Sequence, residues 1–252
     1  MGWIQDNFAL LLDFPTLKVD NTYMSSGLRS FDSNFYYHIY NCGVAKQNVF
    51  FTNNDYLRFL DTISFYLYKQ VISYSHHQRL NEEAMFAYNK LHPKSQESRR
   101  VNILSYCPMP NHFHLLAKPI KENAVSQFIA DITNSYTRYI NTKHERIGSL
   151  FQGTYRSKEI RDDESVLQVT RYIHLNPTFS SKTNPRGNLK KPEDYPYSSY
   201  KEWLIPNSAT LVDKRELSKW LELAGGALAY KEFVEAKIDK NPKGGIEDLV
   251  LE

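Results

Sequence analysis

The sequence has little of three things that would decide its class at once: cysteine, long apolar runs and net charge. Its 252 residues include only Cys42 and Cys107, too few for a disulfide framework or a cysteine-rich zinc site, so we expect two buried thiols. No stretch approaches the roughly 18 to 20 uncharged apolar residues that a membrane helix needs. The N-terminus also lacks the basic start and small-residue cleavage site of a secretion signal. We therefore expect a soluble, cytoplasmic protein.

The formal net charge of +3 is too small to indicate a nucleic-acid partner by itself, so the placement of the charges matters more. Between residues 134 and 161 six basic residues face two acidic ones, a local balance of 6 − 2 = +4. The same segment holds Tyr136, Tyr139, Phe151 and Tyr155. Basic residues can neutralise phosphates and aromatic rings can stack on exposed bases, which suits single-stranded nucleic acid. A solvated helix face with ordinary core aromatics would give the same composition.

Hydrophobic periodicity predicts alternating strands and helices through most of the chain. The expected strands are Phe35–Cys42, Val101–Cys107, His112–Lys118 and Leu150–Ile160. The expected helices are Asn54–Tyr74, Glu82–Leu91, Asn123–His144, Asp163–Leu175, Asp213–Leu223 and Ala227–Ile238. Asn176-Pro177 should end the fourth of these helices, because proline disfavours helical backbone in the residue before it.

The element order predicts an α+β fold, a ferredoxin-like (RRM-like) split β-α-β sheet of four to five antiparallel strands. Its helices should lie on one face, its central strands should be the first and the third, and a helical C-terminal extension should follow. We expect residues 1–30 to form an N-terminal extension of unclear structure. Residues 31–178 should form the catalytic domain and 179–252 a loop and helical extension.

The run Met-Pro-Asn-His-Phe-His-Leu-Leu carries two histidines, His112 and His114, in the third expected strand. Residues two apart in a strand project from the same face, so the two imidazoles point together and Phe113 points the opposite way. Neutral imidazole nitrogens can hold Mn²⁺, Mg²⁺ or Zn²⁺, and the pair is half of such a site. Taken alone, the pair could equally be solvent-facing or hydrogen-bonded.

A later helix carries Tyr172 and Asn176, which are one turn apart on one face because residues i and i+4 align in a helix. If that face packs near the histidine strand, the Asn176 amide oxygen completes a His-His-Asn ligand set. The Tyr172 hydroxyl can then reach a phosphate bound to the same ion. A phenol is mostly protonated at neutral pH, so its attack on a phosphodiester needs a polarised phosphate. For Tyr172 alone, core packing would be the simpler interpretation.

Three ordered motifs resemble a known family. They are Tyr106-Cys-Pro-Met-Pro-Asn-His-Phe-His-Leu-Leu-Ala-Lys-Pro119, Gly148-Ser-Leu-Phe-Gln-Gly-Thr-Tyr-Arg-Ser157 and Tyr172-Ile-His-Leu-Asn-Pro177. Together they resemble the REP-associated tyrosine transposases, a group of single-tyrosine HUH transposases in the IS200-like superfamily. The resemblance covers roughly residues 35–204. Thr154 and Cys42 stand where many relatives have basic residues, which bears on DNA specificity.

The resemblance implies a metal-dependent, single-strand DNA endonuclease and transposase. Its tyrosine, here Tyr172, attacks a phosphodiester near a hairpin and forms a 5′-phosphotyrosine intermediate that later rejoins DNA. The implied cofactor is Mg²⁺ or Mn²⁺, held by His112, His114 and Asn176, with His38 in a supporting role on the neighbouring strand. A nucleoid-associated, prokaryotic protein is implied. The expected DNA-binding residues are Arg138, Lys143, Arg146, Arg156, Lys158 and Arg161.

Relatives work as dimers or, with C-terminal extensions like this one, as monomers, so a monomer is favoured over a homodimer. Two other functions stay open. One is a domesticated hairpin-binding protein that has the sheet but does not cleave DNA. The other is a zinc hydrolase that uses His112, His114 and a carboxylate.

Overall fold

The computed structural model describes residues 30–179, 189 and 191–238, so the expected extension over residues 1–30 lies almost wholly outside them. One antiparallel sheet organises the fold, in the order β2-β3-β1-β4. Its strands are β1 (Tyr36–Cys42), β2 (Val101–Met109), β3 (His112–Pro119) and β4 (Arg156–Ile160). The first and third strands are central, as predicted, and the α+β ferredoxin-like arrangement is confirmed.

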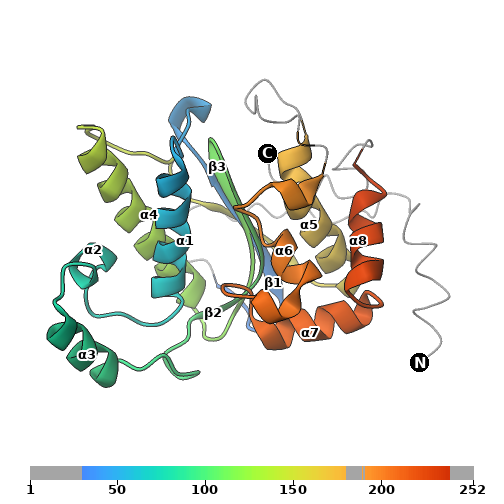
Figure 1. The fold of residues 1–252 in the computed structure, drawn as a ribbon, viewed down its shortest axis with the longest axis horizontal. Helices are drawn as coiled ribbons and strands as arrows, with labels where there is room; N and C mark the ends of the chain where they lie inside the picture. The colour runs from blue at the N-terminus through green and yellow to red at the C-terminus, as the bar shows by residue number, and fades with distance from the viewer. Residues whose placement is uncertain (1–29, 180–188, 190, 239–252) are drawn as a thin grey trace.

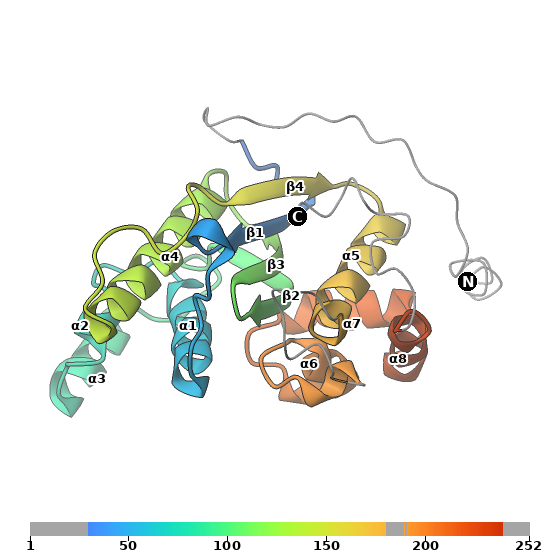
Figure 2. The ribbon, with the colours of Figure 1, turned by 90° about the horizontal axis from the view of Figure 1, so that it is seen from above.

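Two long helices cover one face of the sheet, α1 (Asn53–Tyr66) and α4 (Ala124–Lys143) (Figures 1 and 2). Helix α1 begins with a capping box in which Thr52 and Asp55 satisfy each other's backbone amides. The two helices bury apolar side chains on the sheet, and Phe59 of α1 contacts Phe113 of β3 with ring centroids 5.1 Å apart. The buried side chains of this face belong to a hydrophobic cluster that continues on the other side of the sheet. Two short helices, α2 (Tyr74–His77) and α3 (Glu82–Leu91), extend beyond it.

The opposite face of the sheet is covered by α5 (Asp163–Leu175) and the C-terminal helices (Figure 2). These are α6 (Tyr200–Leu204), α7 (Lys214–Leu223) and α8 (Ala227–Glu235). Four short 3-10 helices are also described, η2 (Val44–Lys46), η3 (Asn176–Thr178), η4 (Pro192–Asp194) and η5 (Pro206–Ser208). The predicted helices on one face are therefore α1 and α4, and the extension supplies a second layer together with α5.

The C-terminal extension covers the edge of β2, which would otherwise expose unpaired backbone groups. Backbone amides of Asp213 and Ser199 donate to the carbonyls of Ile103 and Tyr106, at 2.8 and 3.0 Å. The Trp203 indole donates to the Leu104 carbonyl at 2.9 Å. Such contacts make the extension part of the same core.

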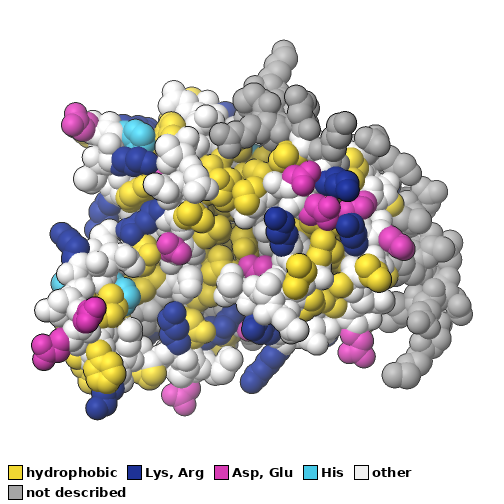
Figure 3. Space-filling view, in the orientation of Figure 1, with side chains coloured by type: hydrophobic (Ala, Val, Ile, Leu, Met, Phe, Trp, Pro, Cys, Tyr) yellow, Lys and Arg dark blue, Asp and Glu magenta, His cyan; other side chains and the backbone are white. Residues whose placement is uncertain are grey.

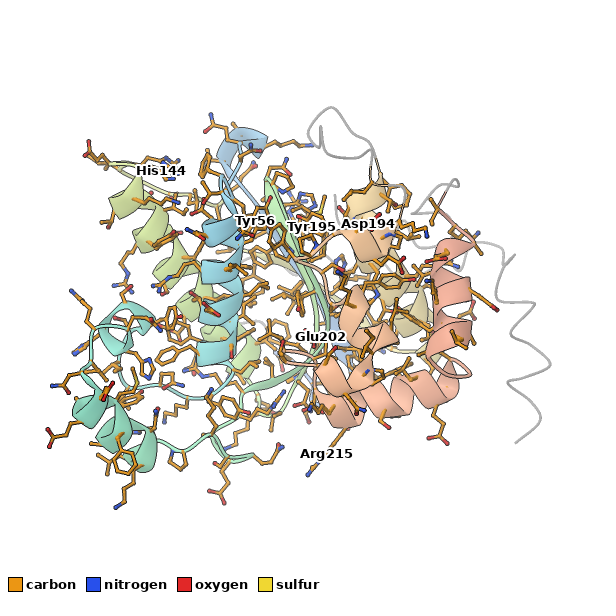
Figure 4. All side chains as sticks on the ribbon, viewed as in Figure 1. Tyr56, His144, Asp194, Tyr195, Glu202 and Arg215 are labelled. Carbon is orange, nitrogen blue, oxygen red and sulfur yellow. The ribbon has the colours of Figure 1, made fainter. Side chains whose placement is uncertain are left out.

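Buried Glu202 joins α6 to β2 and to the segment before α7 (Figure 4). It accepts hydrogen bonds from the Tyr106 hydroxyl at 2.7 Å and from the backbone amides of Thr210 and Val212 at 2.9 and 3.0 Å. Burial, followed by the charge of Glu202, raises the pKa of Tyr106 above its usual range, so this phenol stays protonated and donates. The carboxylate is thereby satisfied inside the fold.

Some expected boundaries were wrong. The helix expected to run to Tyr74 ends at Tyr66, because the next residues pair with residues 98–100 instead: the Lys69 amide donates to Ser98 and the Arg100 amide to Leu67. The strand expected from Leu150 begins only at Arg156, since the positive φ of Gly153 turns the preceding chain. No described helix has both the length and the apolarity to cross a bilayer.

The two cysteines differ from each other. Cys107 is fully buried, as expected, and burial raises the pKa of its thiol. Cys42, at the end of β1, is only half-buried, which corrects the expectation of two buried thiols. The reason is its position, because it is the last residue of β1 and pairs with half-buried His112, where the ladder between β1 and β3 ends.

Candidate active site

Strand alternation places the two motif histidines on the α5 side of the sheet and Phe113 on the α1 side. His112 lies opposite Cys42 of β1, and His114 lies opposite Tyr40. The imidazole rings are edge to face with centroids 4.8 Å apart. His114 is fully buried, whereas His112 is half-buried at the end of the strand. The predicted pairing of the two imidazoles on one face is present.

Helix α5 positions Tyr172 and Asn176 above His114. The Asp162 side chain caps the first turn by accepting from the Ser165 amide at 2.7 Å, and Asn176 is the C-terminal cap before Pro177. The Tyr172 ring meets the His114 ring edge to face, with centroids 5.4 Å apart. The Asn176 side-chain nitrogen is 3.3 Å from His114 Nε2. The structure therefore brings together residues from two motifs about 60 positions apart.

His38 of β1 supports His114 from the neighbouring strand. Its Nε2 is 3.0 Å from His114 Nδ1, and both side chains are fully buried. The two rings are nearly parallel with centroids 5.1 Å apart. His38 lies opposite Leu116, so it reaches His114 along the diagonal of the antiparallel pair.

Asn111 orients His112, the other histidine of the motif. Its Oδ1 is 2.7 Å from His112 Nδ1, and its side-chain nitrogen donates to the Lys46 carbonyl at 3.2 Å. Because Asn111 engages Nδ1, His112 would bind a metal through Nε2. The Pro-Asn turn of the motif thus orients a predicted ligand as well as connecting β2 to β3.

The donor set fits a divalent metal if Asn176 is counted. Among the residues that the structure describes, no cluster of three or more His, Cys, Asp or Glu is placed to hold a metal. The predicted third ligand, however, is an amide. Its oxygen and nitrogen are interchangeable by a flip of the side chain, and the flip turns the oxygen toward His114 Nε2. Two imidazoles and one amide oxygen suit a hard or borderline cation with open positions for substrate.

The predicted DNA-binding residues do not share one environment. Arg138 and Arg156 are exposed, Arg146 and Lys158 are half-buried, and Arg161 is exposed but donates to Glu159 at 2.6 Å. Arg156 also lies over the Tyr40 ring, 5.8 Å from its centroid, so it borders the histidine face. Figure 3 shows lysines and arginines flanking the hydrophobic side chains between α1 and α6, on the face it presents.

Lys143 has a partner within the protein. Its ammonium is 2.6 Å from the carboxylate of fully buried Asp55, which also accepts from the Tyr139 hydroxyl at 3.0 Å. Burial would raise the pKa of Asp55, but Lys143 and the amides of Thr52 and Phe51 outweigh it and lower that pKa. Lys143 therefore has a role in holding α4 to the start of α1.

The aromatic residues of the basic segment pack inside the protein. Tyr136 and Phe151 are buried in the core, and the Tyr136 hydroxyl donates to the Val49 carbonyl at 2.8 Å. The hydroxyls of Tyr155 and Ser126 are 2.8 Å apart. Of the two interpretations that the composition allowed, the burial of Tyr136 and Phe151 therefore fits ordinary core aromatics.

A cavity of about 300 Å³ lies between α4 and residues 149–155. Asn134 and Thr137 line it from α4, and Phe151 and Tyr155 line it from the loop. The cavity combines polar and aromatic side chains, as small-molecule pockets commonly do. Sequence patterns did not reveal it, because it depends on how the loop folds back on α4.

Three further residues on α5 were missed from the sequence. His174 is fully buried between the Tyr230 hydroxyl and the Ser199 hydroxyl, each 2.7 Å away, and burial lowers its pKa to about 3. Gln168 and Arg171 are hydrogen-bonded to each other beside Tyr172. Gln168 could have been found, because it precedes Tyr172 by the same four residues that separate Tyr172 from Asn176.

A histidine pair on a central strand, facing a tyrosine and an asparagine on one helix, defines a site that can combine metal ligation with a tyrosine nucleophile. The chain belongs to the IS200-like transposase family, whose model matches residues 32–176. Membership in this family indicates an enzyme that acts on DNA. The matched residues include all four members of the predicted set.

The chain is also similar to a solved structure of a REP-associated tyrosine transposase bound to a REP hairpin. The identity is 14% and the TM-score is 0.48, over 75% of this chain and 90% of that one. A comparison with curated proteins finds no significant match.

Proposed function

We propose that this protein is a metal-dependent transposase that cleaves and rejoins single-stranded DNA near hairpins through a 5′-phosphotyrosine at Tyr172. The observation that carries the proposal is the convergence of Tyr172 and Asn176 on His114, from a motif distant in the chain. Core packing alone would not require a histidine and an amide at this contact. Family membership supplies the class of reaction.

His112, His114 and Asn176 would hold Mg²⁺ or Mn²⁺. When bound, the ion supplies Lewis-acid polarisation of the scissile phosphate. The Tyr172 oxygen attacks the phosphorus, the bond to the 3′ oxygen breaks, and the DNA 5′ end stays on Tyr172. The phenol loses a proton and the departing 3′ oxygen gains one. Because one phosphodiester replaces another, the 3′-hydroxyl can later reverse the step without an external energy source.

The exposed arginines Arg138 and Arg156 would contact DNA phosphates, with Arg146, Lys158 and Arg161 contributing at the margins. Arg156 is the best placed, since it borders Tyr40 and the histidine face. The DNA partner would be a strand with a palindromic hairpin, in keeping with the solved transposase complex described above. For Lys143, its ion pair with Asp55 supports a structural role beside any contact with DNA.

We propose a monomer as the active unit. The proposed metal ligands and the nucleophile all come from one chain, and His114, Tyr172 and Asn176 are already in contact within it. A homodimer would then not be needed to complete the site.

The test incubates the purified protein and Mn²⁺ or Mg²⁺ with end-labelled single-stranded DNA that carries a hairpin and varied flanks. We expect a covalent protein–DNA adduct that survives denaturation, disappears with a chelator and is absent when the hairpin is scrambled. Tight hairpin binding with no adduct in any metal would instead indicate a binding protein. Stoichiometric zinc with no covalent DNA chemistry would indicate a hydrolase.

A further inference from the structure

We infer that His38 is a positioning residue that fixes the tautomer of His114, an inference that rests on the proposed function. A neutral imidazole carries one proton, on either Nδ1 or Nε2, and only the nitrogen without it can bind a metal. His114 Nδ1 is 3.0 Å from His38 Nε2, and His114 Nε2 lies toward Asn176. If His114 donates from Nδ1 to His38, its Nε2 lone pair is available on the Asn176 side.

Burial makes this hydrogen bond decisive. Both rings are fully buried, so water does not compete for the Nδ1 proton, and leaving that donor without an acceptor would be unfavourable. The acceptor, His38 Nε2, must then be the unprotonated nitrogen of its own ring. The nearly parallel rings, 20° apart, are held by adjacent central strands, so the contact is built into the sheet register. His112 uses an amide, that of Asn111, for the same purpose.

The test compares His38→Gln with His38→Leu. The Gln side-chain oxygen is the same number of bonds from Cα as His38 Nε2, so it can accept the proton, whereas leucine fills space and accepts nothing. In metal-free protein, long-range ¹H–¹⁵N imidazole spectra should show His114 protonated on Nδ1 in the wild type and His38→Gln. His38→Leu should lose that preference. Manganese affinity, measured by electron paramagnetic resonance, should fall about 10- to 100-fold in His38→Leu and stay close to wild type in His38→Gln.

His77→Gln is the matched control, since His77 packs against Phe65 and Tyr88 on the far side of the molecule from α5. It should change neither the His114 tautomer nor the manganese affinity. A wild-type His114 protonated on Nε2, or equal manganese affinity in His38→Leu and wild type, would overturn the inference. If the wild type binds manganese but forms no DNA adduct, the proposed function fails while this inference stands.

A different observation points to a second site. We propose that Arg171 binds a DNA phosphate beside Tyr172, which again rests on the proposed function. Arg171 is 5% exposed. Among the described residues its Nη1 has no hydrogen-bond partner and no carboxylate pairs with the guanidinium. A buried guanidinium without a counter-charge is costly unless an anion completes it. Arg171 can therefore donate a hydrogen bond from Nη1 to an anion and balance the charge of that anion.

The position of Arg171 indicates which anion it would take. Its Nη2 donates to Gln168, which shares a helical face with Tyr172 and Asn176, so the guanidinium is drawn toward the nucleophile's side of α5. Phe233 supports it from α8, 4.3 Å from the ring centroid. Arg171, Gln168 and Tyr172 are all less than a tenth exposed, and a phosphate that reaches Tyr172 would enter the same layer.

The test measures binding of a hairpin-bearing oligonucleotide at several salt concentrations for wild type, Arg171→Met and Arg171→Lys. Loss of one phosphate contact should reduce the slope of log K against log salt by roughly 0.7 to 0.9 in Arg171→Met, and Arg171→Lys should retain it. The DNA-free Arg171→Met protein should unfold at the same or a higher urea concentration, because a buried uncompensated charge has been removed.

Arg58→Met is the control, because Arg58 also stacks on an aromatic ring, that of Tyr74 at 4.1 Å, but in the α1 layer. Its salt slope should match wild type. An unchanged slope in Arg171→Met, or a less stable DNA-free protein, would show that the guanidinium only packs α8 against α5. Failure of the wild type to bind the oligonucleotide would count against the proposed function itself.

Discussion

The two faces of the four-stranded sheet are built from alternate residues of the same strands, yet they differ in chemistry. Toward α1 and α4 the central strands present Ile39, Phe113 and Leu115, all fully buried in the apolar core. Toward α5 they present apolar Leu116 and three buried polar side chains, those of His38, Tyr40 and His114. Burying an imidazole costs free energy unless it is hydrogen-bonded or binds a metal. The polar side chains toward α5 therefore contribute less to the free energy of unfolding than the apolar ones toward α1. We infer that both faces contribute to the hydrophobic core, and that the face toward α5 also carries the residues of the proposed site.

The largest effect is expected when the proposed nucleophile, on the face toward α5, is removed. Tyr172→Phe deletes one hydroxyl and keeps the ring that packs on His114, so we expect no covalent DNA adduct and little change in folding. Denaturing gels with labelled hairpin DNA measure the adduct, and circular dichroism checks the fold. Retention of the adduct would assign the nucleophile elsewhere.

The apolar face should respond in the opposite way. Phe113 lies between the two histidines in sequence but packs on Phe59 and Phe151. Phe113→Ala should lower the free energy of unfolding by about 3 to 5 kcal/mol, because it leaves a cavity in the core. Urea unfolding measures it. A loss below about 1 kcal/mol would contradict the division of roles between the faces.

The α5 layer should also make stability depend on pH. His174 is neutral in the folded protein, with a pKa near 3, whereas the unfolded chain takes up a proton below about pH 6.5. Stability contributed by His174 is therefore present above about pH 6.5 and lost as the pH falls toward 3. Between about pH 7.5 and 5.5 the loss should be about 1.4 kcal/mol in the wild type relative to His174→Gln. Identical pH profiles for the two proteins would contradict the burial of a neutral His174.

The smallest expected effects are those of Lys143→Met and Arg156→Met, which should differ in whether stability or DNA binding changes. Lys143→Met should lower stability by about 1 kcal/mol, because the buried Asp55 loses its cation, and should leave the salt dependence of DNA binding nearly unchanged. Arg156→Met should do the reverse, reducing the salt slope by about one with little change in stability. Measuring both quantities in both variants decides the matter. A lower salt slope in Lys143→Met would place it at the DNA surface after all.

Local periodicity was enough to predict the parts of the site that lie on one element. The two-residue strand repeat placed His112 and His114 together, and the four-residue helix repeat placed Tyr172 with Asn176. The sheet order followed from the order of strands and helices. These features depend on short-range geometry, which the residues themselves specify.

Contacts between distant segments could not be read in the same way. The bond between His38 and His114 depends on strand register, and the surroundings of Arg171 and His174 depend on where the C-terminal helices pack. The ion pair between Lys143 and Asp55 could not be predicted either, because the two residues lie 88 positions apart in the sequence. The early end of α1 also depends on a distant segment, because residues 98–100 form backbone hydrogen bonds with the residues that follow the helix.

The most direct test of the central claim is to locate the covalent bond. The adduct formed with hairpin DNA would be digested with nuclease and trypsin, and the peptides examined by mass spectrometry. We predict a nucleotide-modified peptide that begins at Tyr172, directly after Arg171, with the phosphate on Tyr172. Modification of any of the other 17 tyrosines instead, out of 18 in the chain, would contradict the account.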